Sequence, residues 1–281
     1  MNILRVGRYR LLNHLGEGGS SEVYLAEDTL LRRKVALKIL RRRDADERQT
    51  RHFEREARSA SLLNHPNVVT VFDVGRDEDV HYIATEFVDG ETLRERLDRG
   101  PLTINEAVDI SLAVASALVA AHDAWLVHRD IKPENIAIRK DGVVKVLDFG
   151  VSALSGDGDA TDPLRRPGAF VGTLHYLSPE QVRGEAIIDS RSDVYSLGVV
   201  LYEMLSGRKP FDGTHVIDVL AQIVEREPER LPLTVPKALR ELVARSLRKS
   251  LYDRPQTAGD VLDSLTQVHV DLLLLERAHS A

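Results

Sequence analysis

The 281-residue chain contains no cysteine. Without thiols it forms no disulfide and offers no thiolate to a metal, so its folded state depends on a hydrophobic core. Aromatic residues are also sparse, at 5%, with a single tryptophan. Hydrophobic residues still make up 43% of the chain and charged residues 29%, which is typical of a soluble globular protein. The absence of cysteine is compatible with a reducing compartment, and we expect a cytoplasmic protein.

Long hydrophobic runs are absent as well. The first residues, MNILRVGRYR, lack the apolar core of a signal peptide. The longest apolar-rich run, Ile110–Ala121, is interrupted by two serines and is shorter than a bilayer-spanning helix. We expect it to form a buried helix, and we expect Leu272–Leu275 to lie on a helix face. We therefore expect no membrane segment. Net charge is −6, which argues against a nucleic-acid partner.

What is present is a dense group of polar residues near the middle of the chain. His128–Asn135 reads HRDIKPEN, and Asp148-Phe149-Gly150 begins thirteen residues after Asn135. Asp130, Lys132 and Asn135 place a carboxylate, an ammonium group and an amide within six residues. Such a set of groups is far more specific than an ordinary polar loop before a hairpin.

The residues between these two motifs predict a hairpin. Asp141-Gly142 is a turn signal, and β-branched residues flank it on both sides. The hairpin brings Asn135 and Asp148 to adjacent strand ends. Two oxygen ligands side by side suit Mg²⁺, which keeps several waters and bridges substrate phosphates. An enzyme that moves a phosphoryl group needs such a site, together with an acceptor for the proton of the attacking hydroxyl.

With these motifs the chain resembles the catalytic domain of eukaryotic-like (Hanks-type) serine/threonine protein kinases of bacteria. The resemblance runs from about Gly7 to about Leu265 and rests on several motifs in one order. It implies ATP as the phosphoryl donor and Mg²⁺ as the metal, with Mn²⁺ as an alternative. It implies protein substrates with serine or threonine acceptors, and the sequence leaves homodimerisation open.

The secondary-structure pattern agrees with the α+β, two-lobe protein kinase fold that the resemblance implies. Residues 8–40 predict three antiparallel strands, and Asp44–Leu63 predicts an amphipathic helix. Val68–Val74 and Val80–Val88 predict two further strands, and helical periodicity dominates from Glu91 onward. We expect a small antiparallel β-rich N-lobe with one main helix and a large, mainly α-helical C-lobe.

We take residues 1–281 as a single catalytic domain. The N-lobe is expected over about residues 8–86, the connector over about 86–90 and the C-lobe over about 91–270.

The resemblance assigns a phosphate-binding loop to Gly16–Val23, which reads GEGGSSEV. Glycines there let backbone N–H groups approach phosphates. Ser21 stands where the family usually has its third glycine. The loop residues expected to contact the nucleotide are Gly16, Glu17, Gly18, Gly19, Ser20 and Val23.

Lys38 in Val35-Ala36-Leu37-Lys38 would contact the α- and β-phosphates and pair with a helix glutamate. An unpaired lysine inside such an apolar run would be costly. Glu56 is the expected partner, and Glu54 is the alternative on the same helix.

By the same resemblance, the connector holds the adenine. Backbone groups of Glu86 and Val88 would bind its edge, and Thr85 would guard the back of the pocket. Val23 and Ala36 would cover the ring, in addition to packing within the sheet.

The resemblance also assigns the catalytic roles. Asp130 would accept the substrate hydroxyl proton or orient that hydroxyl, and Lys132 would stabilise charge on the transferred group. Asn135 and Asp148 would bind Mg²⁺. His128 and Phe149 are expected to pack in the core. A lysine two residues after Asp130 resembles the serine/threonine-specific branch.

A peptide-binding platform is expected farther along. Thr173 would contact Asp130 and Lys132, Glu180 would pair with Arg254, and Asp193 would hold the catalytic loop from below. Ser178-Pro179-Glu180 follows the family's Ala-Pro-Glu pattern with serine for alanine. Small-molecule phosphotransferases of related fold lack this platform.

The activation segment departs most from the family pattern. Arg129 implies a basic pocket for a phosphate, but residues 162–172 contain no serine or threonine. Either Thr161 is autophosphorylated, or Asp159 and Asp162 already supply the negative charge. A calcium-loop interpretation of the acidic run fails, because its sixth position is Asp162 instead of glycine and its twelfth is not glutamate.

Two other functions are compatible with parts of this pattern. One is a pseudokinase that acts as a nucleotide-binding scaffold, and the other is a small-molecule phosphotransferase. Every residue with a chemical role is present, which favours an active protein kinase.

Overall fold

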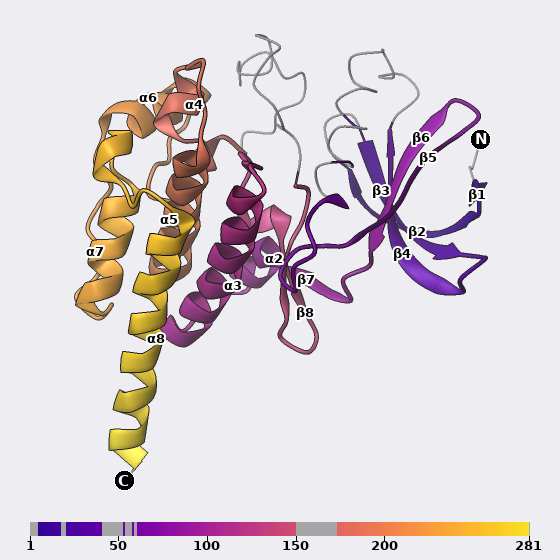
Figure 1. Cartoon of the computed structure of the whole chain (residues 1–281). Coiled ribbons are helices and arrows are strands. Elements are labelled where there is room, and N and C mark those ends of the chain that lie inside the picture. The colour runs from indigo at the N-terminus through magenta and orange to yellow at the C-terminus, as the bar shows by residue number, and fades with distance from the viewer. Residues whose placement is uncertain are drawn as a thin grey trace.

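The computed structural model describes residues 5–17, 21–40, 53, 58, 61–149 and 173–280. Within these residues a curled antiparallel sheet precedes a group of helices, and the two parts lie side by side (Figure 1). This arrangement confirms the two-lobe α+β class.

The N-terminal sheet has six strands in the order β1-β2-β3-β4-β6-β5. The three strands expected over residues 8–40 are β2, β3 and β4, and β1 precedes them. In β4 the residues Val35, Leu37 and Ile39 are buried on one face, as the two-residue period of a strand requires. The bounds are β1 Arg5–Val6, β2 Tyr9–Glu17, β3 Ser21–Asp28, β4 Arg33–Leu40, β5 Val71–Asp77 and β6 Val80–Glu86.

The β5–β6 hairpin is tighter than the sequence suggested. Its turn contains only Glu78 and Asp79, because Asp77 pairs directly with Val80. Glu78 adopts a left-handed φ of 50° to close this turn. The helix expected over Asp44–Leu63 lies mostly outside the described residues.

The C-terminal part is mainly helical, as expected, and α3 and α5 carry much of its core. Capping boxes begin α2 at Thr92 and α3 at Thr103, so local sequence sets both starts. The helices are α2 Leu93–Asp98, α3 Ile104–Asp123, α4 Pro179–Val182, α5 Ser190–Ser206, α6 Val216–Glu225, α7 Lys237–Ser246 and α8 Ala258–Ser280, with 3₁₀ turns η2 Pro133–Asn135, η4 Thr173–Tyr176 and η5 Leu251–Asp253.

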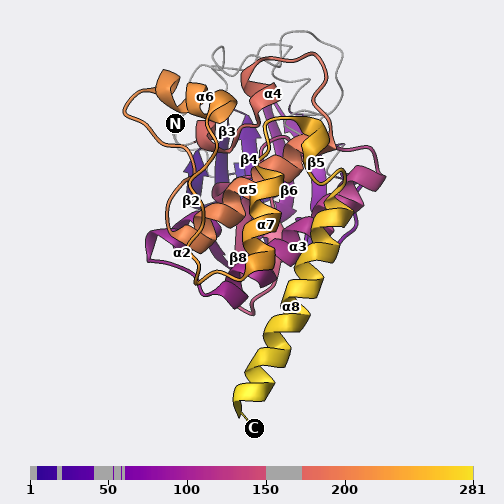
Figure 2. The ribbon, with the colours of Figure 1, turned by 90° about the vertical axis from the view of Figure 1, so that its left-hand side faces the viewer.

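Helix α3 corrects one expectation. The run Ile110–Ala121 is part of a 20-residue helix, which is long and apolar enough to cross a membrane by length and composition. Half of that helix window is buried inside the structure, and α3 packs against α5, α8 and β9. The expectation of a buried helix was therefore right, but the length of the run alone underestimated the helix that contains it. Leu272–Leu275 lies on α8, whose end extends past the other helices (Figure 2).

A second, three-stranded sheet has the order β7-β8-β9. The predicted hairpin forms β8 (Ile136–Arg139) and β9 (Val144–Val146), with Gly142 at a φ of 86° in its turn. The sequence did not predict β7 (Gly90–Thr92), which pairs with β8. Gly90 is needed there, since a Cβ would lie 2.0 Å from the Ile138 carbonyl oxygen.

Candidate active site

The Asp130 carboxylate lies at the centre of the site. Lys132 Nζ and Asn135 Nδ2 both contact its Oδ2, at 2.8 and 3.0 Å. Asn135 Nδ2 also donates to the Asp130 carbonyl oxygen at 2.9 Å. Within the described part of the chain, Oδ1 of Asp130 accepts no hydrogen bond. The arrangement therefore leaves one carboxylate oxygen for a substrate hydroxyl.

A buried carboxylate stabilises an unfavourable backbone conformation next to Asp130. Arg129 adopts a left-handed φ of 63°, a conformation that is unfavourable for a residue with a Cβ. The fully buried Asp193 of α5 accepts hydrogen bonds from the backbone N–H groups of His128, at 2.8 Å, and Arg129, at 2.6 Å. Asp193 thus fixes the backbone of the catalytic loop through these two hydrogen bonds, as the sequence predicted.

The same loop is anchored to the core by His128. This residue is fully buried, its ring packs edge-on against Phe149 at 4.6 Å, and its Nε2 lies 2.9 Å from the Leu147 carbonyl oxygen. Both aromatic residues pack, as expected.

Asp148 lies beside Asn135 because the β8–β9 hairpin brings them together. Ile136 pairs with Val146, and the Leu147 N–H donates to the Asn135 carbonyl oxygen at 2.8 Å. Asp148 itself has a left-handed φ of 53°. Its Oδ1 lies 3.4 Å from Nζ of Lys38 on β4, so this contact joins the N-terminal sheet to the helical part.

These residues fit a magnesium ion that arrives with phosphates. The hydrogen bonds of Asn135 Nδ2 to Asp130 leave its amide oxygen as a ligand, and Asp148 offers a carboxylate. The described residues contain no group of three or more His, Cys, Asp or Glu side chains suited to a metal. Two protein ligands would need phosphate oxygens and water to complete an octahedral shell, which is the usual way that proteins bind Mg²⁺.

Four of the expected nucleotide residues share one face of the N-terminal sheet. Val23 is paired with Lys38, and Ala36 is paired with Thr85. Directly opposed residues of antiparallel strands point to the same side, and Ala36 and Lys38 are two residues apart on one strand. Val23, Ala36, Lys38 and Thr85 therefore line one surface, on the side where Lys38 contacts Asp148.

Glu86 ends β6, and its N–H and carboxylate make short hydrogen bonds. Its N–H donates to the Thr70 carbonyl oxygen at 2.8 Å, and its carboxylate accepts from Lys145 Nζ at 2.7 Å. Its carbonyl oxygen accepts only a long hydrogen bond, at 3.5 Å from Thr85 Oγ1, so it is the group best suited to an adenine edge, with Val88 two residues farther on. Sequence analysis missed Lys145, although a lysine between two valines in a strand suggested a buried partner.

Part of the phosphate-binding loop lies outside the described residues. Gly16 and Glu17 end β2, whereas Gly18, Gly19 and Ser20 are not among the described residues. Ser21 begins β3, is buried and pairs with Leu40. The Ser21 position is an ordinary strand position, so it does not need a glycine. Glu56 and its alternative Glu54 also lie outside the described residues.

The segment expected to form a peptide-binding platform is attached to the catalytic loop. Ser178 caps α4 by accepting a hydrogen bond from the Gln181 N–H, which gives the serine in place of alanine a structural role. Gln181 Nε2 then donates to the Arg129 carbonyl oxygen at 2.8 Å. Sequence analysis missed Gln181, which is the fourth residue of a capping box.

The structure does not test the expected contacts of Thr173 or the expected source of negative charge in the activation segment. Outside its described part lie the Thr173 side chain and residues 150–172, which include Asp159, Thr161 and Asp162.

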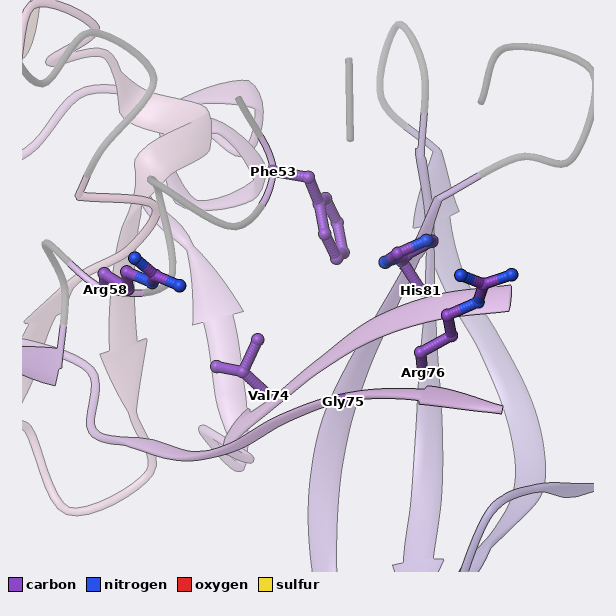
Figure 3. Close-up of a pocket in the computed structure, with 6 residues that line it drawn as sticks. All are labelled: Phe53, Arg58, Val74, Gly75, Arg76 and His81. Carbon is purple, nitrogen blue, oxygen red and sulfur yellow. The ribbon is translucent and has the colours of Figure 1, made fainter. Parts of the chain in front are cut away.

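A cavity of about 440 Å³ lies elsewhere, between the sheet and residues from the expected Asp44–Leu63 helix. Among the residues that the structure describes, its walls carry none of the expected catalytic or nucleotide residues. Figure 3 shows the Phe53 ring pointing toward strands β5 and β6. The lining residues are Phe53, Arg58, Val74, Gly75, Arg76 and His81.

Comparison with known proteins agrees with the site geometry. Residues 9–265 match the family described as the protein kinase domain. The chain belongs to the protein kinase family. Serine/threonine-protein kinase PrkC of Bacillus subtilis is 42% identical over 261 residues, which are 91% of this chain and 39% of that protein. Serine/threonine-protein kinase PknB of Mycolicibacterium smegmatis is 43% identical over 272 residues, or 93% and 43%.

A third relative, PknB of Mycobacterium tuberculosis, is 42% identical over 277 residues, with the same shares of 93% and 43%. The kinase domain is thus similar to bacterial Hanks-type serine/threonine kinases over most of its length. The chain spans about two fifths of the length of these curated relatives.

Proposed function

We propose that this kinase domain transfers the γ-phosphoryl group of Mg-ATP to serine or threonine hydroxyls of protein substrates, itself included. The observation that carries the proposal is the sharing of Asp130 Oδ2 by Lys132 and Asn135, which leaves Oδ1 for the acceptor. A substrate hydroxyl hydrogen-bonded to Oδ1 would be oriented for attack, and the carboxylate would receive its proton.

The other site residues have roles that follow from their chemistry. Lys132 places a positive charge next to Asp130, where charge develops on the transferred group. Lys38 would hold the α- and β-phosphates. Asn135 and Asp148 would hold Mg²⁺, or Mn²⁺ in its place. When bound, the metal would neutralise charge on the phosphates.

Adenine binding is the remaining part of the proposal. Val23, Ala36 and Thr85 would surround the ring, and the backbone of Glu86 and Val88 would bind its edge. Gly16, Glu17, Gly18, Gly19 and Ser20 would cover the phosphates.

The proposal includes a division of the domain into two lobes, with the nucleotide between them. The N-lobe covers about residues 8–86, the connector about 86–90 and the C-lobe about 91–270. A cytoplasmic location belongs to the same proposal, because ATP is available there.

The alternatives have less support. A pseudokinase would lack one of the chemical residues, whereas all five are present. Lys132 and Asn135 contact Asp130, and Lys38 contacts Asp148. A small-molecule phosphotransferase has no use for a platform that is attached to the catalytic loop through Gln181.

The test is phosphorylation of degenerate peptide pools with serine, threonine or tyrosine as the only acceptor, using Mg-ATP and mass spectrometry. We expect incorporation in the serine and threonine pools and no more than traces in the tyrosine pool. Phosphorylation of metabolites but of no peptide would contradict the proposal, and so would nucleotide binding without turnover.

A further inference from the structure

Arg94 connects four separate elements of the helical lobe. It lies in the first turn of α2, the helix that directly follows the connector and β7 (Figure 1). Its Nε donates to Glu134 Oε1 at 3.1 Å, and its Nη1 donates to Glu203 Oε1 at 3.0 Å. Its Nη2 contacts Glu203 Oε2 at 3.3 Å and the Tyr176 hydroxyl. One planar guanidinium thus joins α2 to η2, α5 and η4.

The contact with Glu134 is the one that reaches the catalytic residues. Glu134 is the middle residue of the η2 turn and directly precedes Asn135. Among the described residues, Arg94 is the one hydrogen-bond partner of the Glu134 carboxylate. A three-residue 3₁₀ turn is closed by few hydrogen bonds, here Asn135 N–H to the Lys132 carbonyl and Ile136 N–H to the Pro133 carbonyl. A side-chain anchor on its middle residue therefore limits its rotation.

The groups on the far side of Arg94 are buried and hydrogen-bonded to each other. Glu203 is buried on α5, and the buried Tyr176 hydroxyl donates to Glu203 Oε2 at 2.5 Å. Arg94 is consequently held by α5 and η4 while it holds Glu134. Arg94 thus has buried partners on one side and the short η2 turn on the other. Such an arrangement keeps a metal-ligating group within the small range of positions and orientations that catalysis requires.

We propose that Arg94 is a positioning residue for phosphoryl transfer: through Glu134 it fixes the η2 turn and with it the orientation of the Asn135 amide. This inference rests on the proposed function, in which Asn135 is a magnesium ligand. It assigns Arg94 a role in metal use in addition to its part in folding.

The chain offers a matched control on the same helix. Arg96 has a similarly exposed side chain, at 21% against 22% for Arg94, and it also pairs with a glutamate, Glu106, at 3.1 Å. Glu106 belongs to the capping box of α3, away from the catalytic loop. Arg94→Lys and Arg96→Lys therefore make the same chemical change, and only the first change reaches η2.

The readout is Mg²⁺-dependent ATP hydrolysis without peptide, together with peptide phosphorylation. For Arg94→Lys we expect kcat to fall about 10- to 100-fold and the Mg²⁺ concentration at half-maximal rate to rise, since supports of metal ligands have effects of this size. Arg96→Lys should match the wild type in both.

Because Arg94→Lys disturbs buried partners and could lower stability, Glu134→Ala is the second variant. Glu134 is 42% exposed, so its loss should leave the melting temperature within a few degrees of the wild type. The same fall in hydrolysis and the same shift in Mg²⁺ dependence are expected. In the double variant the loss should be no greater than in either single variant.

Three results would overturn the inference. The first is ATP hydrolysis and Mg²⁺ dependence in Glu134→Ala that equal those of the wild type. This includes the case in which only peptide phosphorylation falls, because a selective loss of that kind would make Glu134 a substrate contact. The second is equal behaviour of Arg94→Lys and Arg96→Lys, and the third is additive loss in the double variant. An inactive wild-type chain would instead contradict the proposed function, and the inference with it.

Discussion

Glu180 and Arg254 form an ion pair that is almost completely closed to solvent. Their side chains are 2% and 0% exposed, and Arg254 Nη1 and Nη2 donate to Glu180 Oε1 and Oε2, each at 2.8 Å. Ser192 Oγ donates to Glu180 Oε1 as well, at 2.5 Å. The pair joins α4 of the proposed peptide-binding platform to the segment that precedes α8, over 74 residues of sequence.

We expect Glu180→Gln to destabilise the domain by about 3–5 kcal/mol, because removing one partner leaves a buried guanidinium without its counter-charge. The measurement is urea unfolding followed by circular dichroism. Glu229→Gln is the control, since the Arg208–Glu229 pair is exposed and should contribute no more than about 1 kcal/mol. Equal effects of the two substitutions would show that burial of the first pair has no energetic consequence.

Glu180 also makes the stability of the domain depend on pH in the acidic range. Burial raises the pKa of Glu180, but the hydrogen bonds and charge of Arg254 and the Ser192 hydroxyl outweigh burial and hold the pKa below its ordinary value of 4.5. The unfolded chain therefore binds a proton at Glu180 more readily than the folded chain does. The contribution of Glu180 to the stability of the fold is fully present above pH 4.5 and is lost as the pH falls through the folded-state pKa. We expect Glu180→Gln to reduce the slope of stability against pH below that value. Unchanged slopes in urea titrations at several acidic pH values would contradict this assignment.

Asp130→Asn should keep the fold and nucleotide binding but lose phosphoryl transfer. A positioned acid–base group contributes about 10²–10⁴-fold, and asparagine cannot accept the hydroxyl proton. The measurement is kcat with a peptide substrate, with nucleotide affinity measured by calorimetry as the control. A variant that keeps more than about a tenth of the wild-type kcat would exclude this role for Asp130.

Lys38→Met should impair phosphoryl transfer, because Lys38 lies 3.4 Å from Asp148 and methionine has no charge with which to bind the phosphates that Lys38 is proposed to hold. Glu56→Gln should impair it less severely, and a double-mutant cycle between Lys38 and Glu56 should show non-additivity. The steady-state rates of the three variants provide the check. Damage from Glu54→Gln with a silent Glu56→Gln would place Glu54 opposite Lys38 instead.

The activation segment supports a prediction from sequence alone. With no hydroxyl residue over 162–172, we expect autophosphorylation at Thr161 or a nearby serine, with the phosphate directed to Arg129. Mass spectrometry and activity of protein made with and without a co-expressed phosphatase would test this. Equal activity without phosphate between Val151 and Thr173 would favour the acidic residues Asp159 and Asp162, which carry less charge than a phosphate. Full activity of the triple variant Thr161→Ala, Asp159→Asn, Asp162→Asn would exclude both mechanisms.

Local sequence determined much of this protein. The alternation of apolar residues predicted β2, β3 and β4, and Asp141-Gly142 predicted the hairpin that places Asp148 beside Asn135. The short offsets within HRDIKPEN put Lys132 and Asn135 within reach of Asp130. These features depend on near neighbours in the chain, so a linear pattern is enough to predict them.

The tertiary structure decided which distant groups meet. No pattern indicated that Arg94 would contact Glu203, 109 residues away, or that Lys145 would pair with Glu86. Strand β7 was also missed, because three residues carry almost no periodicity and its pairing depends on β8. Contacts of this kind form when packing removes side chains from water and leaves charged groups to find partners. The sequence alone determined the chemistry of the site, and the packing of the helical lobe decided what holds that chemistry in place.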